Sequence, residues 1–283
     1  MRLRQNLTLS QALRENKIVT VEVHEAGRHP AGLVACCFSQ EEKMKSSRAF
    51  RETVVKCIRA AVSTPPNTWY RQWRRRNKGL PGTHAGYLEQ PAEFSGRELI
   101  VGGMEIMQEW ERPLMRALAQ EAAQNQGHVL EVGFGMGISA SYLIQSGCSQ
   151  YSVIEPHGDV LKMAREWADK QSVPVQIIEG FWQDVIDGLG LFDGILFDTY
   201  QVLSEDYQDK VYVPFIPKAA AHLRPGGVFT FFSGTSGKLP ADHVALLEAN
   251  FADCRFYEVT GLTPPKDCQY YRDSTMLVPV CKK

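Results

Sequence analysis

The sequence predicts an α/β protein built on a mainly parallel, doubly wound sheet. From about residue 104 onward, short runs rich in Val, Ile and Phe alternate with segments that have the periodicity of amphipathic helices. Glycines or acidic residues directly follow several of the strand-like runs. Open α/β sheets covered by helices on both faces bind ligands at that edge, so the same pattern also predicts a ligand site.

The predicted elements follow one another in a regular order. Strands are expected at 127–134, 150–156, 174–180, 192–200, 228–233, 255–262 and 275–281. Helices are expected at 104–123, 138–147, 159–171, 184–189, 213–223 and 241–252, and a turn at 224–227. Seven strands whose final pair has no helix between them are typical of the methyltransferase version of this sheet.

The first hundred residues give a different pattern. An alternating segment at 18–27 is followed by an amphipathic helix at 49–62, which the Pro65-Pro66 pair ends. A Pro- and Gly-bearing connection then runs over 79–96. We interpret residues 1–100 as an N-terminal extension that acts as a lid, and residues 101–283 as the catalytic domain.

The composition excludes several classes of protein. No apolar run approaches the ~20 residues that a membrane-spanning helix needs, and the N-terminus lacks the pattern of a secretory signal, so a cytoplasmic protein is predicted. The seven cysteines form no CxxC pair and the seven histidines lack metal-ligand spacing, so no metal is expected. A monomer and a homodimer are both compatible with the sequence.

Charge is distributed unevenly along the chain. Residues 1–100 carry 17 Lys and Arg against 9 Asp and Glu, whereas residues 101–283 carry 14 against 23. A basic extension can lie over its own acidic domain, or it can bind nucleic acid. The stretch 69–79 interleaves aromatic residues with arginines, but no nucleic-acid-binding motif flanks it. We therefore do not expect a nucleic-acid partner.

A glycine-rich turn follows the first strand of the sheet. Gly133, Gly135 and Gly137 stand directly before a predicted helix, where backbone N–H groups are free for a ligand. A dinucleotide site would need a third glycine at position 138, which is Ile138, so the pattern favours S-adenosylmethionine over NAD. A glycine-rich turn of another α/β enzyme is the alternative.

Later strand ends supply further candidates for cofactor contacts. Glu155 follows the glycines by about 20 residues, where a carboxylate can accept from both ribose hydroxyls or simply be a solvated acid. Phe181 and Trp182 follow the next strand, where an aromatic ring can cover an adenine or pack in the core.

Two acidic residues are candidates for chemistry on a cationic acceptor. Asp198 ends the strand FDGILFDTY and could hold a guanidinium and take its proton, or cap a turn. Glu111 is spaced by four residues from Met107 and from Met115, so these three are expected on one face of the 104–123 helix. On that face Glu111 is either a buried, functional carboxylate or an acid on a solvated surface. Pro113 suggests a kink or a fresh helix start there.

Several motifs together resemble guanidinoacetate N-methyltransferase and, less closely, the fungal enzyme that methylates the internal arginine nitrogen. They are MQEWERPLMRALA, HVLEVGFGMGI, FWQDV, FDGILFDTY, LRPGGVFTFF, GTS and LTPPKDCQYY, within about 104–283. The resemblance implies a class I methyltransferase (Rossmann-like) fold and S-adenosylmethionine as cofactor. It implies cofactor contacts at Met107, Met115, Gly133, Phe134, Gly135, Met136, Gly137, Ile138, Glu155, Phe181 and Trp182.

The resemblance also implies an acceptor site. Glu111 and Asp198 would grip the guanidino group, Thr235 and Ser236 would hold a substrate carboxylate, and Tyr87 or Phe94 could close over the acceptor. The expected activity is methyl transfer to a small arginine-related molecule: free arginine or a derivative, a cyclic guanidine, or guanidinoacetate. A protein-arginine methyltransferase, and a methyltransferase-like binding module using the basic arm, remain alternatives.

Overall fold

The computed structural model describes residues 20–23, 31–35, 84–202 and 210–283. The chain divides into two units, Met1–Thr68 and Trp69–Lys283. In the first unit, β1 (Thr20–Val23) and β2 (Ala31–Ala35) form an antiparallel hairpin, and β1 lies in the segment predicted to alternate. The helix predicted at 49–62 and the basic stretch 69–79 lie outside the described residues.

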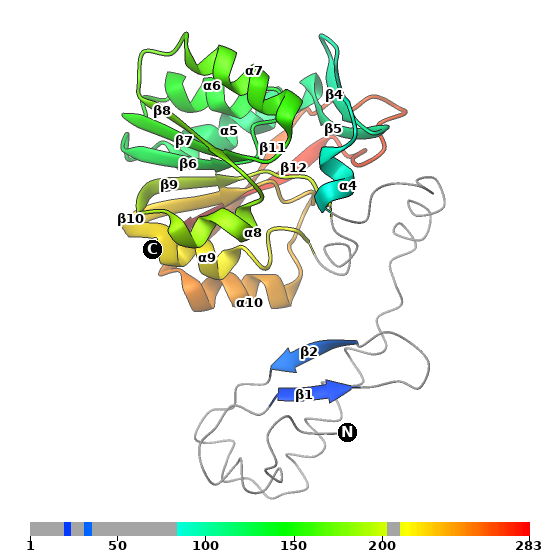
Figure 1. The fold of residues 1–283 in the computed structure, drawn as a ribbon. Coiled ribbons are helices and arrows are strands. Elements are labelled where there is room, and N and C mark those ends of the chain that lie inside the picture. Colours follow the sequence, from blue (N-terminus) through cyan, green and yellow to red (C-terminus); the bar gives the residue numbers. More distant parts are fainter. Residues whose placement is uncertain (1–19, 24–30, 36–83, 203–209) are drawn as a thin grey trace, which may run out of the picture. The chain divides into compact units, whose positions relative to one another are not determined.

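The second unit is built on a seven-stranded sheet in the order β11-β12-β10-β9-β6-β7-β8 (Figure 1). Its strands are β6 (His128–Val132), β7 (Gln150–Glu155), β8 (Val175–Glu179), β9 (Phe192–Phe197), β10 (Leu223–Phe231), β11 (Asp253–Thr260) and β12 (Thr275–Lys282). Only β12 runs antiparallel to its two neighbours, and the other pairings are parallel. The predicted class I methyltransferase fold is therefore confirmed.

Helices cover both faces of this sheet (Figure 1). On one face lie α5 (Arg112–Ala122), α6 (Ile138–Gln145) and α7 (Gly158–Ala168); on the other lie α8 (Trp182–Val185), the 3-10 turn η3 (Ile186–Gly188), α9 (Ile216–His222) and α10 (Ala241–Asn250). Each face has its own cluster of buried apolar side chains. Among the described residues, no helix is long and apolar enough to cross a membrane.

The turn predicted at 224–227 lies inside β10. The register of β10 against β9 shifts between Leu223 and Val228, and Gly226 has φ 76°. The strand therefore begins before this irregularity, where the sequence predicted it to begin after the turn.

The single helix predicted over 104–123 is wrong. Residues Met104–Gln108 form a strand, β5, which the 3-10 turn η2 (Glu109–Glu111) joins to α5. Pro113 lies in the first turn of α5, where its missing N–H costs nothing, and this starts a new helix. Upstream, Gly102 and Gly103 turn the chain with φ of 56° and 79°, so that β5 can pair back on the preceding strand.

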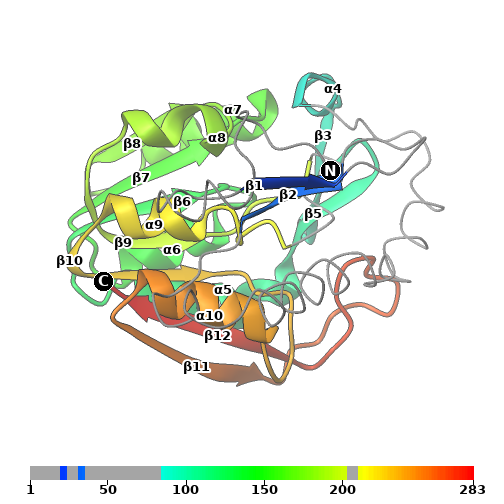
Figure 2. The same cartoon turned by 90° about the horizontal axis from the view of Figure 1, so that it is seen from below.

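The second unit also holds a small antiparallel sheet in the order β3-β4-β5. Here α4 (His84–Leu88) precedes β3 (Ala92–Phe94) and β4 (Glu98–Val101). Residue 100, the predicted end of the extension, falls inside β4. Figures 1 and 2 show α4, this small sheet and the connection between β11 and β12 beyond the carboxyl ends of the parallel strands. These three segments therefore surround the edge where the ligand site was predicted.

Candidate active site

The glycine-rich loop joins β6 to α6. Gly133, Gly135 and Gly137 have φ of 91°, 54° and 70°, in the left-handed region that favours glycine. A Cβ on Gly133 would lie 2.1 Å from the carbonyl oxygen of Asp198. This loop therefore runs closer to the end of β9 than any side chain permits, and it ends at the N-terminus of α6, where Ile138 is the first helical residue.

Glu155, the last residue of β7, is anchored to that loop. Its Oε2 accepts the backbone N–H of Phe134 at 3.0 Å, and its Oε1 accepts that of His157 at 2.8 Å. Burial raises the pKa of this carboxyl, and the backbone N–H groups of His157, Phe134 and Gly135 oppose the rise. The two oxygens of a carboxylate can together accept about four hydrogen bonds, so Glu155 keeps acceptor capacity for a further donor. A hydroxyl of a ligand can supply that donor.

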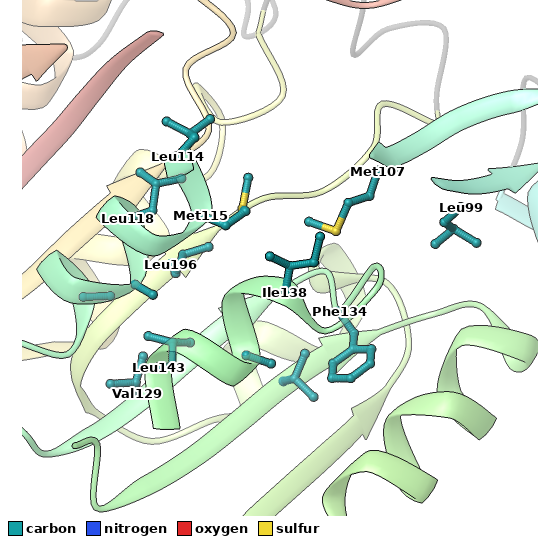
Figure 3. Packing of buried hydrophobic residues seen from close by; sticks show 14 of the residues in the cluster. Leu99, Met107, Leu114, Met115, Leu118, Val129, Phe134, Ile138, Leu143 and Leu196 are labelled. Carbon is teal, nitrogen blue, oxygen red and sulfur yellow. The ribbon is translucent and has the colours of Figure 1, made fainter. Parts of the chain in front are cut away.

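The two methionines reach the same region although they do not share a helical face. Met107, on β5, accepts the N–H of Met136 at its Sδ, 3.3 Å away. A Cβ on Gly135 would lie 2.8 Å from that sulfur. Met115, on α5, is fully buried in the same cluster (Figure 3). The pairing of β5, and not a four-residue helical spacing, brings Met107 to the loop.

The two aromatic residues at the start of α8 point to different surroundings. The ring of Phe181 stacks on His84 of α4, with centroids 3.6 Å apart and planes 7° apart. The Trp182 indole makes edge-to-face contacts with Phe197 and Phe215 and belongs to the cluster on the α8–α10 face. The Trp182 indole therefore packs in the core. The Phe181 ring instead stacks on His84, a residue that the sequence did not single out.

The α4–β3 segment is tied to the end of β7. His157 contacts the carbonyl of Gln90 at 2.8 Å through Nε2, and Asp159 accepts the N–H of Ala92 at 3.1 Å. Tyr87 is buried edge-on against the His157 ring, at 5.4 Å between centroids. Of the two aromatic candidates for closing the site, Tyr87 is buried near Glu155, whereas Phe94 is 42% exposed.

Glu111 and Asp198 come from different parts of the sheet edge. Asp198 directly follows β9, and its N–H donates to the carbonyl of Val132 at 3.0 Å. Glu111 ends η2 and is only 2% exposed. Its Oε1 accepts the backbone N–H of Gln108 at 2.7 Å and the hydroxyl of Tyr270 at 2.6 Å. The Glu111 carboxylate is thus held by a backbone N–H and a tyrosine hydroxyl, whereas for Asp198 it is the backbone that is fixed against β6.

The two carboxyls share one electrostatic environment. Burial, together with the nearby Asp198, raises the pKa of Glu111 to about 8, and burial raises the pKa of Asp198 to about 7. On β6, burial raises the pKa of Glu131 to about 8, although the Tyr151 hydroxyl donates to it.

Lysine and arginine side chains do not offset these acids in the described part of the chain, although the nearby His157 lowers the pKa of Glu155. None of the four acids Glu111, Glu131, Glu155 and Asp198 forms a salt bridge with a described Lys or Arg. Buried carboxyls without counter-charges favour a cationic ligand, which would lower their pKa values again. The residues at this edge therefore fit a sulfonium cofactor and a cationic acceptor.

Thr235 and Ser236 lie on the loop after β10. This strand pairs with β9, the strand that Asp198 follows. The loop starts at Phe232, whose N–H donates to the carbonyl of Phe197 at 3.0 Å. The hydroxyl of Thr235 donates to the carbonyl of Ser233 at 3.2 Å, and that of Ser236 to Asp273 at 2.7 Å. Both hydroxyl protons are used within the protein, so their role toward a substrate carboxylate stays a prediction.

Comparison with known proteins gives consistent matches. The chain is 30% identical over 216 residues to Protein arginine N-methyltransferase 2 of Kluyveromyces lactis, which covers 66% of this chain and 51% of that protein. It is 36% identical over 140 residues to the protein of the same name from Eremothecium gossypii, covering 46% and 32%. The chain thus spans about half the length, or less, of these curated relatives.

Among solved structures, the N-methyltransferase NodS of Bradyrhizobium japonicum WM9 matches with a TM-score of 0.45 and 16% identity, over 61% of this chain and 96% of that one. The family model for guanidinoacetate N-methyltransferase matches residues 83–283. Since this match covers more than half of the sequence, the chain belongs to the guanidinoacetate N-methyltransferase family, which uses S-adenosylmethionine as its cofactor.

Proposed function

We propose that this protein transfers a methyl group from S-adenosylmethionine to a nitrogen of a guanidino group. The pair Glu111 and Asp198 is the observation that carries the proposal. The two acids come from separate elements and affect each other's ionisation, and neither forms a salt bridge with a described Lys or Arg. Asp198 also lies beside the glycine loop. Two carboxylates facing one site match the fork of N–H donors that a guanidinium presents.

The residues divide into two groups under this proposal. The glycine loop, Met107 and Glu155 would hold the cofactor, which supplies an electrophilic methyl group on a positively charged sulfur. Glu111 and Asp198 would accept N–H groups of the acceptor and aim one nitrogen. Asp198 would take the proton that this nitrogen releases, because its burial, which raises the pKa of the carboxyl, favours the protonated form.

The acceptor proposed is a small molecule: free arginine or a derivative, a cyclic guanidine, or guanidinoacetate. Two observations support a guanidino group at the end of the molecule. Glu111 is only 2% exposed, so the group that meets it must leave water almost completely. The Thr235–Ser236 loop begins beside the end of β9, and under this proposal it would bind the other end of a short acceptor.

A second candidate is an arginine side chain of a protein. The names of the relatives from Kluyveromyces lactis and Eremothecium gossypii favour it. The third reading, a binding module without activity, would tolerate loss of the glycines and carboxylates, yet both sets are intact.

The experiment is methyl transfer from labelled S-adenosylmethionine to a panel of acceptors. The panel holds free arginine, guanidinoacetate, a cyclic guanidine and arginine-containing peptides. Label in a small molecule supports the proposal, and label in peptides alone supports the second candidate. In either case Asp198→Asn should lower turnover by ~10² to 10⁴, the range for a lost general base, with little change in cofactor affinity. No label in any guanidino compound would reject the function.

A further inference from the structure

A tyrosine from a distant part of the chain holds Glu111. Tyr270 lies on the connection between β11 and β12, and its hydroxyl donates to Glu111 Oε1 at 2.6 Å. Its ring lies against Trp110, with centroids 5.9 Å apart and planes 32° apart. Glu105 of β5 accepts the N–H of Gln269 at 2.7 Å, which fastens the connection next to Tyr270. The position of the Tyr270 hydroxyl is therefore determined by the packing of its ring and by a neighbouring backbone contact.

The contact makes the two oxygens of Glu111 different. Oε1 already accepts two hydrogen bonds, from the Gln108 N–H and the Tyr270 hydroxyl. Two donors fill the acceptor capacity of one carboxylate oxygen. Among the described residues, no hydrogen bond is made to Oε2. Oε2 is therefore the oxygen that can receive a new donor.

We propose that Tyr270 is a positioning residue of the acceptor site, whose hydroxyl turns Glu111 so that Oε2 receives a guanidinium N–H. The proposal rests on the proposed function, because that function supplies the guanidinium N–H that would donate to Oε2. Tyr270 itself does not touch the acceptor in this scheme. It acts only through Glu111.

The same hydrogen bond affects the charge of Glu111. Three described titratable groups interact electrostatically with Glu111. They are Asp198 at the end of β9, and Tyr270 and Cys268 on the β11–β12 connection. Burial and Asp198 raise the pKa of Glu111, whereas the hydroxyl of Tyr270 lowers it. Without that hydroxyl the pKa of Glu111 rises further. Less of the carboxylate is then ionised at neutral pH, and a higher pH restores it.

The test compares Tyr270→Phe with Tyr271→Phe in the full chain. Tyr271 is a close control because its ring stacks on the same Trp110, at 5.7 Å and 9°, and its hydroxyl donates to the backbone carbonyl of Thr275. The measurements are kcat and KM for the best acceptor of the panel between pH 6.5 and 9, and the Kd of S-adenosylmethionine.

For Tyr270→Phe we expect KM to rise about tenfold or more at pH 7, the lower limit for a lost hydrogen bond to a charged group. The rise should shrink toward pH 9, and the cofactor Kd should not change. Tyr271→Phe should alter KM less than Tyr270→Phe does, because the Tyr271 hydroxyl, which contacts Thr275 and Ser236, makes no hydrogen bond to Glu111. Equal KM values and equal pH profiles for the two variants would overturn the proposal.

A second measurement separates this proposal from the proposed function. In a Glu111→Ala background, which removes the oxygen that accepts from Tyr270, Tyr270→Phe should shift the thermal midpoint differently from its shift in the wild type, because the two residues are in contact. This coupling needs no turnover. If the wild type methylates no guanidino compound, the proposed function fails, while additive effects of the two substitutions on unfolding would refute the Tyr270 contact itself.

Discussion

Replacing Glu111 with Gln should stabilise the ligand-free protein, and increasingly so as the pH rises. Glu111 is 2% exposed, and burial with the nearby Asp198 raises its pKa to about 8. In the unfolded chain the same carboxyl titrates near 4.5. An acid whose pKa is raised on folding costs nothing below the unfolded pKa, and its cost grows with pH until the folded pKa is reached.

The magnitude follows from the distance between the two pKa values. At pH 7 the unfolded carboxyl is about 2.5 units above its pKa, and at 1.36 kcal/mol per unit this costs the folded protein about 3 kcal/mol. At pH 5 the same calculation leaves under about 1 kcal/mol. A Gln at position 111 keeps the oxygen that accepts from Gln108 and Tyr270 and has no charge to lose. For a domain of this size, about 3 kcal/mol corresponds to about 6 to 12 °C in Tm.

The assay is thermal unfolding of wild type and Glu111→Gln at pH 5 and pH 7, without ligand. The matched control is Glu166→Gln, which removes one exposed negative charge from α7. We expect a gain in Tm for Glu111→Gln that is small at pH 5 and large at pH 7, and no such growth for the control. A gain of the same size at both pH values, or a loss of stability at pH 7, would refute the argument. A variant that is more stable but inactive would indicate that the Glu111 carboxyl lowers the stability of the fold and is needed for activity.

Three further predictions concern the cofactor edge and the extension. Gly133→Ala should lower Tm and abolish cofactor binding in calorimetry, because its Cβ would lie 2.1 Å from the carbonyl oxygen of Asp198 at a φ of 91°; wild-type affinity would contradict this. Glu155→Ala should weaken S-adenosylmethionine binding at least about tenfold, since charge-assisted hydrogen bonds are lost, and an unchanged Kd would exclude the ribose assignment. Deleting residues 1–68 should leave a folded, cofactor-binding domain with slow turnover, and full activity would show that this unit is no lid.

The seven-stranded sheet could be predicted from the sequence because its signals are local. Most strands of the sheet are largely apolar runs with Gly, Pro or acidic residues beside them, and the predicted strands overlap β6 to β12. The glycine loop is equally local, since three glycines before a helix have few other uses. Because successive parallel strands end at one edge, Glu155 and Asp198 could be placed at that edge from their positions alone.

The segment before α5 was misread because its pattern suits two structures. Met107, Glu111 and Met115 are spaced as on a helix, yet Met107 belongs to a strand. The strand forms at Met104–Gln108 because β4 offers a hydrogen-bonding edge to this segment. Pro113 also favours a new helix start over the continuation of a helix from upstream. A periodicity of four residues cannot reveal such a partner.

By itself, the sequence determined the sheet, the glycine loop and the acids at the strand ends, because short-range patterns encode all three. Only the tertiary structure decided how the site is completed. It placed Tyr270 on Glu111 across 159 residues, put His84 on the ring of Phe181, and turned the Trp182 indole into the core. It also set the pKa values of Glu111 and Asp198, since burial and proximity, which have no signature in a linear sequence, raise both.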